Sequence, residues 1–237
     1  NLSSDDPSFQ GRKIELHRLA VALLSNKKRC ISLHGMGGIG KTMLAIAAGR
    51  WQHERQRWRD GVWFVDLRNV DDAATARMRI IKEIPLKTAS RQGDVPQNLR
   101  ALFRNLRVLL ILDDLDELLR KDSEGLVTLI NDLLSCGKLR LLVTSREMLP
   151  PEVFSESQEV ETLESSEMFR QLFETYAPSE EDWGIDDNFE EDWEVLRELL
   201  AGYPLAIRIA AQYMQQKRCS LHTLRKRLEE QFLKTLQ

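Results

Sequence analysis

The feature that most constrains the fold is a glycine-rich segment placed between an apolar run and a helical pattern. It reads GMGGIGKT over residues 35–42 and directly follows the β-rich residues 29–34. Glycines permit backbone conformations in which successive N–H groups point into one cradle, and the helix that follows adds the positive end of its dipole. The order strand, loop and helix therefore predicts a phosphate-binding loop of the P-loop type.

The polar side chains of this loop have predicted roles in holding a nucleotide and its magnesium ion. Lys41 is expected to reach the β- and γ-phosphates as a mobile charge, and the Thr42 hydroxyl is expected to ligate Mg²⁺. A merely flexible glycine turn would not need Lys-Thr at its end in this setting. The predicted cofactor-binding residues of the loop are Gly37, Gly38, Ile39, Gly40, Lys41, Thr42 and Met43.

A second acidic site follows another apolar run. Residues 109–112 read LLIL, and Asp113 and Asp114 come directly after them. Because parallel strands share their carboxyl edge, we expect Asp113 to lie beside the magnesium ion, through a water. Asp114 is expected to accept a proton from, or to orient, the water that attacks the γ-phosphate. The alternative is that Asp114 and Asp116 only cap the following helix or turn, and for Asp116 we prefer that interpretation.

The organisation of the whole chain predicts an α/β domain followed by a helical one. The expected strands cover residues 29–34, 61–67, 107–113, 139–144 and 159–163, and the stretches 42–51, 72–84, 96–103 and 123–134 show helical spacing. After residue 163 only helical patterns follow, over residues 165–176, 189–201, 204–216 and 220–236. We predict a P-loop three-layer parallel sheet sandwich in domain 1–163 and a small all-helical subdomain in 164–237.

Composition narrows the classes of function. The 34 basic and 37 acidic residues give a net charge of -3, which supplies no general field for nucleic acid or anionic lipid, so we expect neither as a partner. Cys30, Cys136 and Cys219 lack the spacing of a disulfide framework or a zinc site, which fits a reducing cytoplasm. No apolar run approaches the roughly 18 residues of a membrane span. The polar start and the helical end suggest an excised fragment.

Two further features are expected to be structural rather than functional. Residues 180–194 are almost wholly acidic, with Trp183 and Trp193 embedded, and such a charge run is usually a solvated face. The four histidines are scattered without the spacing of metal ligands. We therefore expect the acidic run to face water and each histidine to be structural or exposed.

The order of the motifs resembles that of the signal-transducing STAND ATPases, and within them the NB-ARC group shared by plant disease-resistance proteins and apoptosome scaffolds. LLVTSR over residues 141–146 resembles the family's sensor strand, which implies that Arg146 reads the γ-phosphate. Gly202-Tyr203-Pro204-Leu205 resembles its Gly-x-Pro signature, which implies that Pro204, with Leu205, packs on the adenine.

The resemblance extends to residues ahead of the phosphate loop. Phe9-Gln10-Gly11-Arg12, with Glu15, resembles the family's N-terminal motif, which implies that Phe9, Gln10 and Arg12 lie near the adenine and phosphates. Gln10 departs from the usual small apolar residue. The match therefore spans nearly the whole chain.

The resemblance implies an ATP/ADP-binding switch with slow Mg²⁺-dependent hydrolysis, for which Asp114, Lys41 and Arg146 are the predicted catalytic residues. ADP would hold a closed state, and ATP would permit an open state that self-associates. The family continues into a winged-helix domain and into effector and sensor regions, which we expect outside this sequence. Two alternatives stay open: an AAA-type ATPase that acts on nucleic acid, and a nucleotide-stabilised scaffold without turnover.

Overall fold

The computed structural model describes residues 12–84, 99–184 and 188–235, and these form two compact units. Residues 12–37 and 41–160 make up the α/β unit, while residues 161–235 group with residues 38–40 in the helical unit. We predicted a boundary after residue 163, and this division lies after residue 160. None of the helices in the described ranges is long and apolar enough to cross a membrane.

The α/β unit is built on a five-stranded sheet in which every strand pair is parallel. The strands are β1 (Cys30–His34), β2 (Val62–Asp66), β3 (Leu109–Asp113), β4 (Arg140–Ser145) and β5 (Glu156–Glu159), in the spatial order β2-β3-β4-β1-β5. Parallel pairing places all carboxyl ends at one edge and all amino ends at the other. The parallel sheet with flanking helices confirms the predicted fold class.

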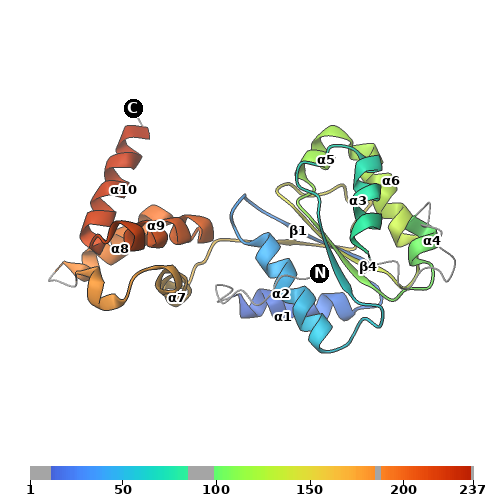
Figure 1. Cartoon of the computed structure of the whole chain (residues 1–237), viewed down its shortest axis with the longest axis horizontal. Coiled ribbons are helices and arrows are strands. Elements are labelled where there is room, and N and C mark those ends of the chain that lie inside the picture. The colour runs from blue at the N-terminus through green and yellow to red at the C-terminus, as the bar shows by residue number, and fades with distance from the viewer. Residues whose placement is uncertain (1–11, 85–98, 185–187, 236–237) are drawn as a thin grey trace. The chain divides into compact units, whose positions relative to one another are not determined.

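Helices cover both faces of the sheet, as Figure 1 shows. One face carries α1 (Lys13–Leu24) and α2 (Lys41–Glu54), and the other carries α3 (Ala73–Glu83), α4 (Leu99–Phe103), α5 (Asp116–Lys121) and α6 (Ser123–Leu134). Alternate strand residues such as Leu110 and Val143 pack with Leu129 of α6. Burial on both faces explains why β3 reads as a continuous apolar run.

The helical unit contains α7 (Ser166–Tyr176), the 3-10 helix Glu180–Trp183, α8 (Phe189–Leu200), α9 (Pro204–Lys217) and α10 (Leu221–Thr235). Its core is aromatic. The ring centroids of Phe173 and Trp183 lie 5.4 Å apart, and those of Trp183 and Trp193 lie 5.7 Å apart. Stacked and edge-on rings bury much apolar area in a small volume, so they stabilise this unit.

The acidic run does not lie wholly in water as expected. Most of its carboxylates are exposed, but Asp192 is buried on α8. Its oxygens lie 2.8 Å from His222 Nδ1 and 2.6 Å from Arg225 Nε, both on α10. A buried carboxylate must be compensated by such partners. The solvated interpretation was therefore wrong for Asp192, which joins α8 to α10 and gives His222 the structural role that we expected.

The fifth strand lies earlier in the chain than predicted. We expected it at residues 159–163 on the apolar residues there, whereas β5 covers Glu156–Glu159. As an edge strand, β5 pairs only with β1, so its side chains can be polar. Val160 and Leu163 are buried, but no strand includes them. The helices α1 and α5 were not predicted.

Candidate nucleotide site

The glycine-rich loop begins where β1 ends, and its first residue is held tightly. Gly35 has φ 141°, and a Cβ built on it would lie 2.7 Å from the carbonyl oxygen of Val160, so only glycine fits. Gly35 N–H donates to the carbonyl oxygen of Arg146 at 3.2 Å. The loop therefore starts fixed against the chain segments that follow β4 and β5, and it ends where α2 begins at Lys41.

The side chain of Lys41 folds back onto this loop. Its ammonium donates to the carbonyl oxygens of Gly35 at 2.7 Å and Met36 at 2.9 Å. Burial lowers the pKa of Lys41, and the negative charge of Asp116 opposes that shift. The charge that we predicted for phosphate binding is therefore present at the loop, held by backbone oxygens that a phosphate oxygen could replace.

Thr42 and Asp113, the two predicted magnesium ligands, lie together. Asp113 is 1% exposed, and the Thr42 hydroxyl lies 2.9 and 3.0 Å from its two carboxylate oxygens. The Thr144 hydroxyl donates to Asp113 Oδ1 at 2.6 Å. Burial raises the pKa of Asp113, and the bonds from Thr144 and Thr42 oppose that rise.

This donor set fits magnesium, because Mg²⁺ prefers oxygen ligands and is usually held by one or two carboxylates together with nucleotide phosphates. Thr42 and Asp113 would hold the ion, which would neutralise charge on the phosphates. In the described ranges no group of three or more His, Cys, Asp or Glu side chains could hold a metal ion. A site of this kind therefore depends on the nucleotide for its remaining ligands.

Asp114 lies at the same edge in a strained backbone conformation. Its φ is 61°, in the left-handed region, and its N–H donates to Thr144 Oγ1 at 2.9 Å. Its carboxylate accepts from Arg68 Nε at 3.2 Å. Arg68 was not among the predicted site residues; it comes two residues after β2 and so lies at the carboxyl edge of the sheet. This position just after a predicted strand was the sequence signal that could have identified Arg68 as a site residue.

Arg146 lies directly after β4, beside the loop. Its side chain is 68% exposed, and a Cβ built on Gly37 would lie 3.5 Å from its guanidinium carbon. Asp116 holds it twice, because one carboxylate oxygen accepts from the Arg146 backbone N–H and the other lies 3.1 Å from Nε. The helix-cap interpretation of Asp116 was wrong: the N-cap of α5 is Leu115, and the Asp116 carboxylate instead faces Arg146.

The remaining predicted residues belong to other parts of the chain. Arg12 is buried at the start of α1, where it pairs with Glu15 at 3.3 Å. Phe9 and Gln10 lie outside the described residues. Pro204 and Leu205 open α9 in the helical unit, with Pro204 in the first turn. The adenine contacts implied for these residues stay predictions.

Comparison with known families identifies the class of protein. The model of the AAA domain family matches residues 24–150. The chain belongs to the AAA domain family. The matched span contains the phosphate loop, Asp113, Asp114 and Arg146. The protein is thus a P-loop ATPase of the AAA type.

One relative of this AAA domain chain is an uncharacterised protein of Mycobacterium tuberculosis. The two are 33% identical over 144 residues, which is 60% of this chain and 34% of that protein. The chain therefore spans about a third of the length of this relative.

Solved structures that share the fold include an ORC protein and a STAND protein. The Aeropyrum pernix ORC1 protein in complex with DNA aligns with a TM-score of 0.62 and 19% identity, covering 94% of this chain and 67% of that one. A STAND protein with a tetratricopeptide repeat sensor from Pyrococcus horikoshii aligns with a TM-score of 0.52 and 19% identity, covering 87% and 30%. At these identities the two structures show a shared fold, and the expectation that nucleic acid is not a partner stays a prediction.

Proposed function

We propose that this AAA domain chain is an ATP/ADP-binding switch module of the STAND and NB-ARC type. The observation that carries the proposal is the place of Arg146 next to Gly37 of the phosphate loop. A guanidinium gains a bidentate, charge-assisted partner only when a phosphate group comes within reach. An arginine at the end of β4 that meets only the third phosphate would separate ATP from ADP.

Asp116 supports this role for Arg146. Its carboxylate holds both the backbone N–H and the Nε of Arg146, so the side chain has a defined resting partner beside the loop. Exchange of that carboxylate for a γ-phosphate would change the contacts of α5, which begins at Asp116. The two nucleotide states would then differ in the position of this helix.

Hydrolysis in this proposal is slow and depends on Asp114. A carboxylate beside the γ-phosphate can accept the proton of the attacking water, and the Asp114 carboxylate is engaged by Arg68 Nε at 3.2 Å before any nucleotide binds. A switch is expected to dwell in each state rather than to recycle quickly. ADP would favour a closed form and ATP an open, self-associating form, with winged-helix, effector and sensor regions as partners in a longer chain.

The test compares ATP and ADP binding by calorimetry in Arg146→Ala, with Mg²⁺ present. We expect a loss of about tenfold or more for ATP and little change for ADP, the usual scale of a charge-assisted hydrogen bond. Arg120→Ala is the matched control, because Arg120 is exposed and pairs with one acid, Glu117, at 2.6 Å. Asp114→Asn in the same assays should bind both nucleotides and lose hydrolysis. Equal losses of ATP and ADP in Arg146→Ala would refute the sensor role.

A second candidate function is an ATPase that acts on nucleic acid, which the fold shared with the DNA-bound ORC1 protein favours. The two candidates predict different responses of ATP turnover. A switch should hydrolyse ATP at the same rate with and without DNA or RNA, whereas an ATPase of the second kind should be stimulated. A nucleotide-stabilised scaffold would show no turnover in either condition.

A further inference from the structure

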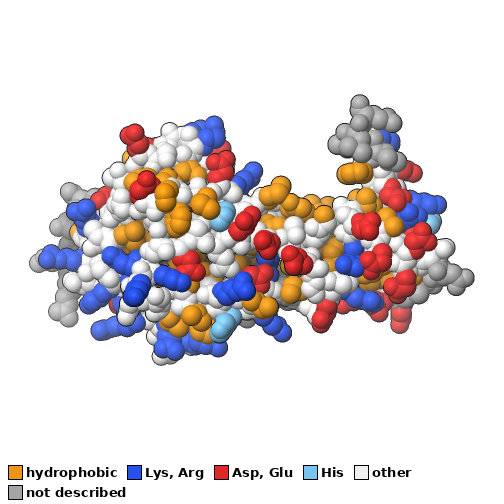
Figure 2. Space-filling model, turned by 180° about the vertical axis from the view of Figure 1, so that it is seen from behind, with side chains coloured by type: hydrophobic (Ala, Val, Ile, Leu, Met, Phe, Trp, Pro, Cys, Tyr) orange, Lys and Arg blue, Asp and Glu red, His pale blue; other side chains and the backbone are white. Residues whose placement is uncertain are grey.

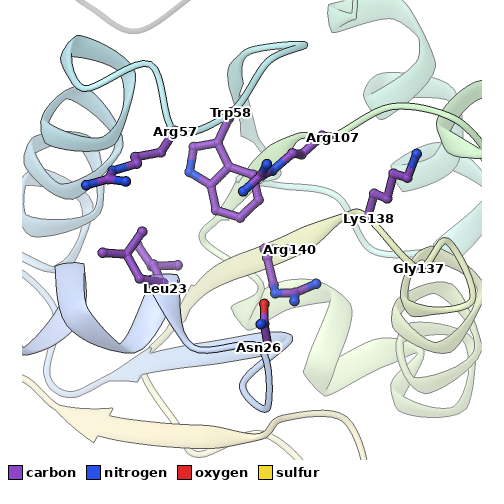
Figure 3. A pocket seen from close by; sticks show the side chains of 9 residues that line it. Leu23, Asn26, Arg57, Trp58, Arg107, Gly137, Lys138 and Arg140 are labelled. Carbon is purple, nitrogen blue, oxygen red and sulfur yellow. The ribbon is translucent and has the colours of Figure 1, made fainter.

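A basic cavity lies at the sheet edge opposite the phosphate loop. Its volume is about 370 Å³, and its lining includes the side chains of Asn26, Arg57, Trp58, Arg107, Lys138 and Arg140 (Figure 3). The Arg107 side chain approaches the ring of Trp58, and Arg140 lies next to Asn26. Cavities of roughly 300 to 1,000 Å³ are typical of small-molecule sites.

The topology of the sheet brings these residues together. Asn26 precedes β1, Trp58 precedes β2, Arg107 precedes β3, and Arg140 is the first residue of β4. Because these strands are parallel, their amino ends meet at one edge, whereas the phosphate loop follows the carboxyl end of β1. The cavity is therefore a separate site from the one described above.

The cavity has an excess of positive charge. Among the described residues that line it, four are Arg or Lys and none is acidic. Burial lowers the pKa of Arg140, and the charges of Arg29 and Arg107 lower it further. Figure 2 shows Lys and Arg side chains gathered over one end of the α/β unit. Like charges that line one cavity repel one another, and an anion bound between them would relieve that repulsion.

The nearby acids are engaged elsewhere. Asp60 Oδ2 accepts from the backbone N–H of Arg107 at 2.8 Å, and Glu156 pairs with Lys28. Two buried donors, Trp58 Nε1 and Arg29 Nε, have no hydrogen-bond partner within the described part of the chain. This edge thus has donors and cations in excess of acceptors. Phosphate oxygens are the acceptors that arginine forks bind best.

We propose that this cavity binds a small phosphorylated anion through Arg107 and Arg140. The guanidinium carbon of Arg107 lies 6.0 Å from the ring centroid of Trp58, within the range of a cation–π contact. The Arg107 side chain is therefore already positioned when a phosphate binds. Arg57 and Lys138 add charge at the rim of the cavity. The concave shape favours a compact ligand over an extended polymer.

The test titrates the ADP-saturated chain with inorganic pyrophosphate by calorimetry, while a fluorescent ADP analogue reports that the phosphate loop stays occupied. Pyrophosphate should bind without displacing the analogue. Arg107→Ala and Arg140→Ala should each weaken its affinity by about tenfold or more, the scale of one lost bond to a charged group. Arg104→Ala is the control, because Arg104 is exposed and does not line the cavity, and it should change the affinity less than about twofold.

Thermal unfolding separates a binding role from a structural one. Without pyrophosphate, Arg107→Ala and Arg140→Ala should melt close to the parent, because the removal of a repelled charge offsets the loss of the Trp58 contact in one variant and of the hydrogen bond to the Leu139 carbonyl oxygen in the other. With pyrophosphate, the parent should gain melting temperature, and these variants should not. No pyrophosphate binding, or an equal loss in Arg104→Ala, would overturn the proposal. A further experiment measures the affinity for oligothymidylates of increasing length. If the affinity rises with length, the ligand of this cavity is a nucleic-acid backbone and the small-anion proposal is overturned.

Discussion

Thr144 is the residue whose removal should report most directly on how the acidic edge is held. It is 1% exposed on β4. Its hydroxyl donates to Asp113 Oδ1 at 2.6 Å and accepts from the backbone N–H of Asp114 at 2.9 Å. Thr144→Val keeps the shape of the side chain but removes both bonds.

The expected loss follows from these two bonds. A hydrogen bond to a charged group is worth about 1.5 to 3 kcal/mol, and a neutral one about 0.5 to 1.5 kcal/mol. The replacement also leaves the Asp114 N–H without this acceptor. At pH 7 we therefore expect Thr144→Val to lower the free energy of unfolding of the α/β unit by roughly 2 to 4 kcal/mol.

The loss should depend on pH, and its sign can be derived. Burial raises the pKa of Asp113 in the folded chain, and the Thr144 bond opposes that rise, so Thr144→Val should raise this pKa further. The unfolded value does not change. Above the folded pKa the variant therefore shows its full loss, and as the pH falls through that pKa Asp113 becomes protonated and the loss shrinks.

Native-state hydrogen exchange of the β3 and β4 amides measures this free energy for the α/β unit alone. Thr128→Val is the matched control, because the Thr128 hydroxyl donates to the Glu124 carbonyl oxygen at 2.9 Å on the exposed face of α6. It should cost less than about 0.5 kcal/mol. The reasoning fails if Thr144→Val costs no more than Thr128→Val, or if its cost is the same in acid as at pH 7.

Two other variants test the loop and the helical core. Lys41→Ala should weaken the binding of ATP and of ADP alike, because it removes the cation at the loop. The control Lys82→Ala changes an exposed residue of α3 and should leave both affinities unchanged. If calorimetry finds unchanged affinities for Lys41→Ala, the phosphate-loop assignment is contradicted. Trp193→Ala should lower the free energy of unfolding of the helical unit by about 3 to 5 kcal/mol, because it removes a buried ring whose centroid lies 5.4 Å from that of the Phe173 ring. A loss below about 1 kcal/mol in urea unfolding would show that this aromatic cluster is not its core.

The sequence was most informative where a short local pattern determines the structure. The phosphate loop is an example, because its glycines, its lysine and the following helix are contiguous in the chain. Asp113 could be predicted for a related reason: a fully apolar strand marks a buried position in a parallel sheet, and its last residue must then lie at the carboxyl edge. Thr42 and Asp113 do meet there, 71 residues apart in sequence.

The contacts that surround these residues could not be predicted in the same way. Arg68 reaches Asp114 across 46 residues, and Thr144 reaches it across 30. Each contact depends on which strands are neighbours, and the order β2-β3-β4-β1-β5 is a property of the whole sheet. Asp116 shows the limit most clearly, since its local position indicates a helix cap whereas its partner, Arg146, follows β4 and lies 30 residues further along the chain.

The charge of the molecule illustrates why a total can mislead. A net charge of -3 averages over the whole chain, yet charged groups interact mainly within about 8 Å at physiological ionic strength. In the α/β unit, the carboxyl edge of the sheet carries both acids (Asp113, Asp114 and Asp116) and cations (Lys41, Arg68 and Arg146), while the cavity at the amino edge is lined by Arg and Lys without an acid among the described lining residues. A parallel sheet separates the residues before its strands from those after them, so its two edges can differ in local charge although the charge of the whole chain is nearly balanced. Each edge should therefore select its ligand by its own charges, and the nearly balanced total excludes neither an anion at the amino edge nor a metal-bound nucleotide at the carboxyl edge.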